Sequence, residues 1–103
     1  MITTKGTILL NDGVTSVVNP LINVYTVGAS KFIKTSGVAQ YGRVVKQGEG
    51  ETATEYFQQV GNLGGESGEW NTGDIADPKF TDVQNAVLKG LVEKYPDCTF
   101  TVL

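Results

Sequence analysis

The sequence lacks most of the side chains on which enzyme chemistry at neutral pH depends. Its 103 residues include no histidine and one cysteine, Cys98. Histidine is the commonest general base and the commonest zinc ligand, so a serine or threonine nucleophile would have no base to activate it. The single cysteine cannot form a disulfide within the chain, and we expect it to be a small buried hydrophobic residue. We therefore expect a protein that is not an enzyme and that uses no metal or cofactor.

Long apolar runs are also missing. No stretch approaches the roughly 18–20 apolar residues that a membrane-spanning helix needs. The first ten residues do not have the pattern of a signal peptide, because only three apolar residues follow Lys5 before a turn begins. We expect a protein that remains in the cytoplasm or is packaged in a virion, with no membrane partner. The length is enough for a single domain, residues 1–103.

The net charge of −3 is unevenly distributed. Residues 1–46 carry five cationic residues and one acidic residue, whereas residues 47–103 carry three cationic and ten acidic residues. Such a split can indicate association through complementary surfaces, although it more often reflects two solvated faces of one domain. The charge pattern alone leaves both interpretations open.

The first half of the sequence predicts β-strands. β-Branched and aromatic residues alternate with polar ones over residues 2–46, in runs separated by short turns. The Asn-Asp-Gly triplet at 11–13 is typical of a hairpin turn, and Gly42 is a candidate for a β-bulge. Two lysines are placed to protect an edge strand over residues 31–37. We expect four or five strands here, mainly antiparallel.

A short helix is predicted over residues 52–60. Thr52 and Glu55 have capping-box spacing, and apolar residues follow at positions i, i+3, i+4 and i+7, which is the spacing of one helix face. A strand carrying Tyr56 is the alternative interpretation of this stretch.

A longer amphipathic helix is predicted over residues 79–94. Its apolar stripe comprises Phe80, Val83, Val87, Leu88, Leu91 and Tyr95. Asp77 or Thr81 is expected to cap its start. Gly90 costs about 1 kcal/mol in a helix relative to alanine, which suggests that it allows the helix to pack closely on a sheet.

These patterns together predict an α+β fold. A mainly antiparallel sheet is formed by residues 2–46, the main helix packs on one face, and a last strand over residues 98–103 joins the sheet. A β-sandwich or barrel with a peripheral helix is the alternative.

A glycine-rich acidic loop is predicted over residues 61–78, and it contains the sole tryptophan, Trp70. Its glycines match no phosphate-binding motif, and its acidic residues match no EF-hand. Glu66 and Glu69 lie among glycines, which are too flexible to hold a catalytic pair in place. Trp70 either caps the core or lies exposed as an anchor for a partner. Because so long a loop is uncommon unless it is functional, we expect it to be an adaptable contact loop.

A basic stretch is the second candidate contact surface. Cationic and aromatic residues interleave in it: Lys31, Phe32, Lys34, Tyr41, Arg43 and Lys46. This composition is typical of single-stranded nucleic-acid platforms, but four cations and a negative total charge argue against that ligand. The residues that we predict to contact a protein partner are Trp70, Glu66, Glu69, Lys31, Lys34 and Arg43.

Two hypotheses of function come from different classes. The first is a structural or assembly protein that self-associates or binds a larger scaffold, such as a capsid- or tail-associated accessory protein of a phage particle. Small size and a composition rich in glycine, threonine and asparagine suggest that setting. The second is a small inhibitor that blocks a host enzyme or nucleic-acid-binding protein through its acidic second half.

Overall fold

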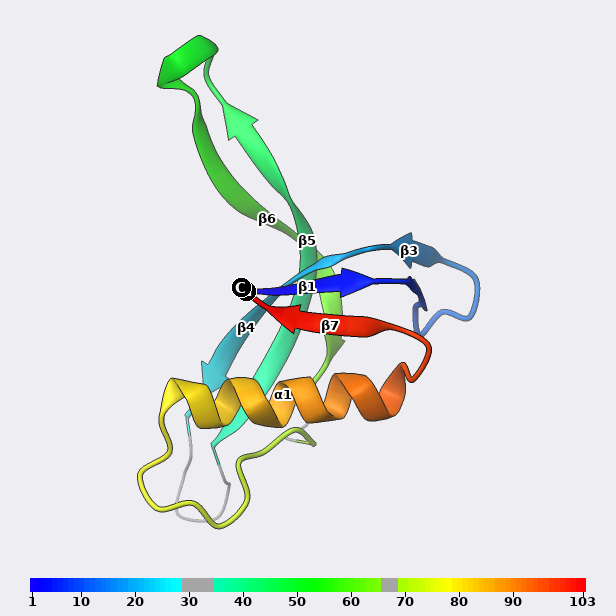
Figure 1. Cartoon of the computed structure of the whole chain (residues 1–103), viewed down its shortest axis with the longest axis vertical. Helices are drawn as coiled ribbons and strands as arrows, with labels where there is room; N and C mark the ends of the chain where they lie inside the picture. Colours follow the sequence, from blue (N-terminus) through cyan, green and yellow to red (C-terminus); the bar gives the residue numbers. More distant parts are fainter. Residues whose placement is uncertain (29–34, 66–68) are drawn as a thin grey trace.

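A computed structural model describes residues 1–28, 35–65 and 69–103 and has the predicted α+β architecture (Figure 1). The main strands are β1 (Ile2–Lys5), β4 (Leu21–Val27), β5 (Ser36–Gln47), β6 (Thr54–Gly64) and β7 (Thr99–Val102), and the helix α1 spans Phe80–Lys94. Within the described ranges these strands form a five-stranded sheet of order β6-β5-β4-β1-β7, with every neighbouring pair antiparallel. A separate hairpin consists of β2 (Thr7–Leu9) and β3 (Ser16–Val18).

The first and last strands of the chain pair with each other. Ile2 of β1 lies between Ile22 of β4 and Val102 of β7 in the ladder. The predicted C-terminal strand is thus confirmed, and it forms one edge of the sheet. The predicted hairpin turn at 11–13 is also confirmed, because it joins β2 to β3.

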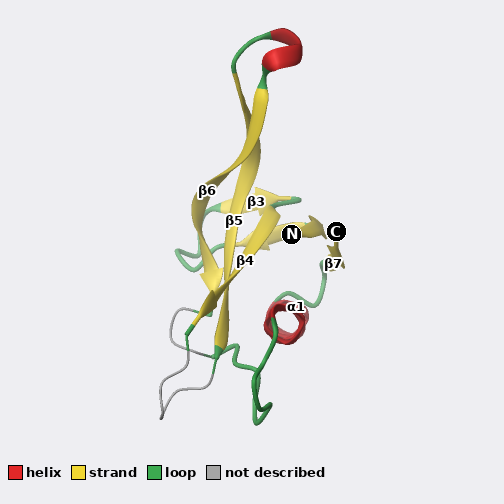
Figure 2. Cartoon of the chain, turned by 90° about the vertical axis from the view of Figure 1, so that its left-hand side faces the viewer, coloured by secondary structure: helices red, strands yellow, loops and turns green. Residues whose placement is uncertain are grey.

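The core lies between α1 and one face of the sheet (Figure 2). Its most buried side chains are Ile2, Ile8, Ile22, Leu63, Val83, Val87 and Leu91. A Cβ on Gly37 of β5 would contact the side chains of Val83 and Val87, so the glycine allows the helix to approach the sheet closely. Cys98 is half-buried and packs against this core, as a small hydrophobic residue would.

The main helix is confirmed, but its capping residue differs from the prediction. The Asp82 carboxylate accepts a hydrogen bond of 2.8 Å from the Lys79 backbone N–H. Asp77 instead has a φ of 52°, which belongs to a turn rather than to a helix cap. The helix begins at Phe80, so Lys79 is its N-cap residue and Thr81 lies within the first turn rather than at the cap.

The predicted helix over residues 52–60 is wrong, and the alternative interpretation, a strand carrying Tyr56, is confirmed. The 3₁₀ helix η1 (Gly50–Thr52) is a single turn that ends at the first residue of this range, and the residues from Thr54 onward form β6. Gly48 and Gly50 have φ values of 103° and 62°, which a tight reversal requires. The reversal brings β6 alongside the twelve-residue β5. The hydrogen bonds between the two strands stabilise the strand conformation more than a helix of only nine residues would be stabilised by its apolar spacing. Residues 61–64, predicted as loop, continue the same strand.

The distal half of the β5–β6 hairpin projects from the rest of the molecule (Figures 1 and 2). We call residues 43–60 the arm. The strand β4 pairs with β5 only as far as Gly42, so the arm is a ribbon of two strands. The radius of gyration is 14.9 Å, whereas a compact domain of this length is expected to have about 13 Å. The arm accounts for the elongated shape.

A β-bulge marks the base of the arm. The register of β5 with β6 shifts between Tyr41 and Gly42 and, two residues earlier, between Ala39 and Gln40. A Cβ at Gly42 would collide with the backbone carbonyl of Gln58. The predicted bulge at Gly42 is therefore confirmed, and it increases the local twist that directs the arm away from the sheet.

Candidate functional site

Trp70 belongs to the core, since its side chain is only 8% exposed. A Cβ on Gly64 would lie 2.8 Å from the indole Cη2, and a Cβ on Gly90 would collide with the indole Nε1. These two glycines leave the space that the ring fills. Gly90 allows close packing, but the group packed on it is the Trp70 ring rather than the predicted sheet. The exposed-anchor interpretation of Trp70 is corrected by this burial, and the core-capping interpretation agrees with it.

Backbone hydrogen bonds fix the segment around Trp70 to the start of β5. The Gly37 N–H donates to the Trp70 carbonyl over 3.0 Å, and the Thr72 N–H donates to the Thr35 carbonyl over 2.9 Å. Between them, Ser36 and Asn71 form an isolated β-bridge. This part of the predicted contact loop is therefore attached to the sheet.

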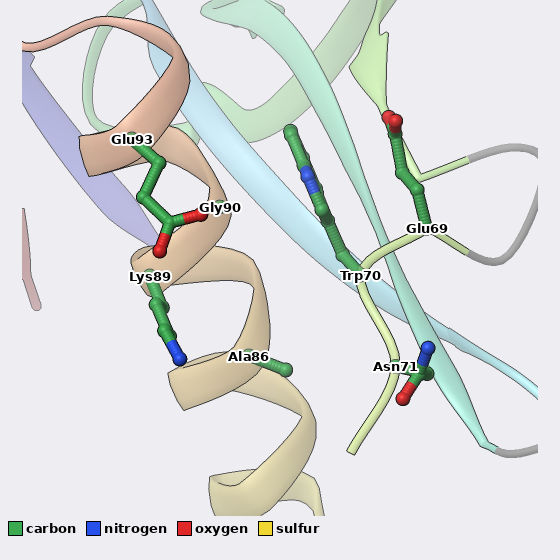
Figure 3. Close-up of a pocket in the computed structure, with 7 residues that line it drawn as sticks. All are labelled: Glu69, Trp70, Asn71, Ala86, Lys89, Gly90 and Glu93. Atoms are coloured by element: carbon green, nitrogen blue, oxygen red, sulfur yellow. The ribbon is translucent and has the colours of Figure 1, made fainter. Parts of the chain in front are cut away.

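A groove lies between this segment and α1 (Figure 3). Its volume is about 190 Å³, and it is lined by Glu69, Trp70, Asn71, Ala86, Lys89, Gly90 and Glu93. A second hollow of about 390 Å³ shares Asn71, Ala86 and Lys89 and extends to Ile75 and Asp82. The groove offers the carboxylate of Glu93, the ammonium of Lys89 and the indole of Trp70, which can form ion pairs, hydrogen bonds and apolar contacts with a bound group.

The predicted contact residues that the structure describes do not share one surface. Glu69 lies at the groove, where its Oε1 accepts a hydrogen bond of 3.0 Å from the Gly65 N–H, and Figure 3 shows its carboxylate on the far side of the indole from Glu93. Arg43 lies on the arm, where its Nε donates to Gln58 Oε1 over 3.1 Å. Glu66, Lys31 and Lys34 lie outside the described residues, as does most of the predicted strand over residues 31–37.

A third hollow of about 280 Å³ lies at the C-terminal end of α1. Burial raises the pKa of the Tyr95 phenol, and the charges of Cys98 and Glu69 add to that effect. The neutral phenol is therefore favoured over the phenolate more strongly than in water. Among the described residues, no cluster of three or more acidic, cysteine or histidine side chains is placed to hold a metal ion.

The arm carries exposed apolar side chains on a ribbon that has no core of its own. Val44, Tyr56 and Val60 are 51%, 45% and 61% exposed, and the register of the two strands places Val44 and Tyr56 on opposite faces of the ribbon. An ion pair crosses the ribbon, between Lys46 Nζ and Glu55 Oε1 at 3.6 Å. The β2–β3 hairpin also has exposed apolar side chains, Leu9, Val14 and Val18, so the arm differs from it by its projection from the sheet rather than by exposure alone.

Sequence reasoning missed this surface because the helical interpretation of residues 52–60 placed Tyr56 and Phe57 on a buried helix face. One available signal was the adjacency of β-forming residues on both sides of a Gly-x-Gly reversal, Val44-Val45 before it and Tyr56-Phe57 after it. That pattern favours a hairpin.

Comparison with known proteins assigns no relationship: no protein-family model, no curated protein and no solved structure matches the chain. Within the described part of the structure, no helix is long and apolar enough to cross a membrane.

Proposed function

We propose that this protein is a non-enzymatic assembly protein that acts through protein–protein contacts made by the arm. The observation that carries the proposal is the projecting ribbon with its exposed Val44, Tyr56 and Val60. An isolated two-stranded hairpin is at best marginally stable in water. A contact that covers the arm would bury its apolar side chains and supply the strand or surface that it lacks.

An accessory protein of a virus particle is one setting that fits such a role. The setting is suggested by size and composition, and the arm supports the more general part of the proposal, association with another protein.

The test is to remove the arm while keeping the body of the protein. Replacing residues 44–57 by Asn-Gly joins Arg43 to Gln58, which are opposite each other in the ladder, by a two-residue hairpin turn. The body should remain folded with its helical circular dichroism unchanged, because the deleted residues contribute no fully buried side chain.

The measurement is the native size of the tagged chain in extracts of its own host. The full chain should elute within a larger complex, and the arm-less chain should elute as the free protein. Val14→Ser is the matched control, because Val14 is an exposed valine of the β2–β3 turn, outside the arm. The proposal fails if the arm-less chain stays in the complex, or if the full chain elutes free.

A second candidate is favoured by the carboxylates around the groove. Glu69, Asp82 and Glu93 line the groove and its extension beside a single ammonium, Lys89. An acidic surface of this kind suits an inhibitor that occupies the phosphate-binding site of a nucleic-acid-binding protein. Charge reversal at Asp82 and Glu93 should then abolish inhibition, whereas removal of the arm should leave it intact.

A further inference from the structure

The proposed arm contact leaves open which protein covers the arm, and three features of the ribbon bear on that question. They are the two free strand edges, the charges on each of them, and the side chains that share each face. The answer that they support rests on the proposed function and adds the identity of the partner.

The two edges of the arm differ in their protection against pairing. The free part of β5, residues 43–47, carries Arg43 and Lys46, and cationic residues are a common device that keeps an edge strand from pairing. The edge of β6 over residues 54–59 has no lysine, arginine or proline. Its one charge, Glu55, already faces Lys46. Pairing with an added strand is therefore more favourable at the β6 edge than at the β5 edge.

The faces of the arm follow from the register of β5 with β6. Opposite residues share a face, so Val44 and Phe57 lie together on one side, and Val45 and Tyr56 lie together on the other. Glu55 is on the same face as Phe57, opposite Lys46. The stretch from Thr54 to Gln59 is regular, and the bulge follows at Val60.

We propose that the partner is a second copy of this chain, and that the two β6 strands pair antiparallel with Phe57 opposite Phe57 of the other copy. This register extends the Val44–Phe57 row into a continuous apolar row of four side chains across four strands. It also places Glu55 opposite the uncharged Gln59 of the other copy, so no like charges meet.

Other symmetric registers are less favourable. Centring the pair on Tyr56 would place the Glu55 carboxylate opposite Phe57. Centring it on Gln58 would place the bulged Val60 opposite Tyr56, inside the ladder, whereas the Phe57 register leaves Val60 at the end of the ladder, opposite Thr54. In the Phe57 register, two identical β6 strands place compatible side chains opposite each other. The product is a four-stranded sheet of order β5-β6-β6-β5, which satisfies the requirement for at least three strands with an apolar face.

A cross-linking experiment tests the partner and the register together. In a Cys98→Ala background, Glu55→Cys and Gln59→Cys are made as separate proteins, one with a tag that changes its mass. In the proposed register these two positions face each other across about 4.5–5.5 Å between Cα atoms, which is within the range of a disulfide. Two copies of the same position lie four residues apart along the ladder, at roughly 13 Å.

Mild oxidation of the mixture should give at least tenfold more mixed disulfide than disulfide between identical variants. Sedimentation of the unmodified chain should show a dimer, twice the 11.0 kDa of the monomer. Phe57→Lys places two ammonium groups opposite each other and should weaken the dimer at least tenfold, whereas Val14→Lys, on the exposed β2–β3 turn, should not change it.

Two results would overturn the inference. A chain that sediments as a monomer at high concentration and gives no mixed disulfide has no self-partner. A disulfide that forms readily between two Glu55→Cys chains excludes the Phe57 register. If the chain is monomeric while the arm-less variant still leaves its native complex, another protein covers the arm, and the proposed function stands without this partner.

Discussion

Because Gly90 packs against Trp70, we predict that the effect of Gly90→Ala on stability changes sign with the residue at position 70. In a helix, Gly→Ala ordinarily adds about 1 kcal/mol of stability. Here the new Cβ would collide with Trp70 Nε1 and lie 2.6 Å from Cδ1 and Cε2 of the same ring, so the ring must move. Overpacking of this kind costs about 1–3 kcal/mol. Gly90→Ala should therefore be destabilising by up to about 2 kcal/mol.

The same substitution should become stabilising once the ring is removed. In a Trp70→Leu background the Cβ introduced by Gly90→Ala meets a smaller side chain, and the gain of about 1 kcal/mol from helix propensity should reappear. Trp70→Leu is preferred to Trp70→Ala because truncation to alanine costs about 3–5 kcal/mol, a large fraction of the roughly 5–15 kcal/mol typical of a domain.

The assay is urea unfolding of the four proteins of this double-mutant cycle. Far-UV circular dichroism is the suitable probe, because Trp70 is the only tryptophan and its fluorescence is lost in half of the set. Lys89→Ala, at the exposed neighbouring position, is the control and should change stability by less than about 0.5 kcal/mol. If Gly90→Ala has the same effect in both backgrounds, the helix does not pack on Trp70, and the account of the groove fails with it.

Two further predictions concern a buried hydroxyl and an exposed turn. Thr4 is 7% exposed, and its Oγ1 has no hydrogen-bond partner among the described residues, so Thr4→Val should stabilise the protein by about 1–2 kcal/mol in thermal or urea unfolding; Thr3→Val, which removes a hydroxyl bonded to the Thr101 carbonyl at 3.3 Å, should give no such gain. The pKa of Asp12 is lowered by its hydrogen bonds from the Thr15 hydroxyl and from backbone N–H groups. Because its pKa is lower in the folded than in the unfolded chain, this carboxylate stabilises the fold at neutral pH and stops doing so as the pH falls through the folded value, below 3.8. The stability difference between the wild type and Asp12→Asn should therefore vanish in acid, and a difference that persists at about pH 2 would contradict the assignment.

The candidate contact residues that the structure describes lie on different elements. Glu69 and Arg43 are both exposed, as a contact residue must be, but they lie at the groove and on the arm respectively. Composition marks a residue as suited to a surface, and it does not indicate which residues share that surface. The exposed apolar side chains of the arm were overlooked because a residue such as Tyr56 has the same identity on a buried helix face and on an uncovered ribbon.

Hydrophobic periodicity was sufficient to predict an element where only one tertiary arrangement could bury its apolar face. The alternation in β4 places Ile22 and Val24 in the core and leaves Tyr25 and Val27 exposed, and the stripe of α1 buries Val83, Val87 and Leu91. Each pattern encodes which face must leave water, and a single sheet-and-helix arrangement buries both sets. The α+β class, the main helix and the last strand follow from this local information.

Residues 52–60 and Trp70 required the tertiary structure, for one physical reason. The spacing of Ala53, Tyr56, Phe57 and Val60 fits a helix, whereas the β-forming residues on both sides of the reversal at residues 48–50 fit a hairpin. The strand hydrogen bonds that decide between the two become available only when β5 lies alongside. Trp70 is likewise buried by Gly64 and Gly90, which are near it in space but come from β6 and α1. The conformational preference of a segment is encoded in its own residues. Where those residues allow two conformations, the distant segment that packs against them determines which one forms.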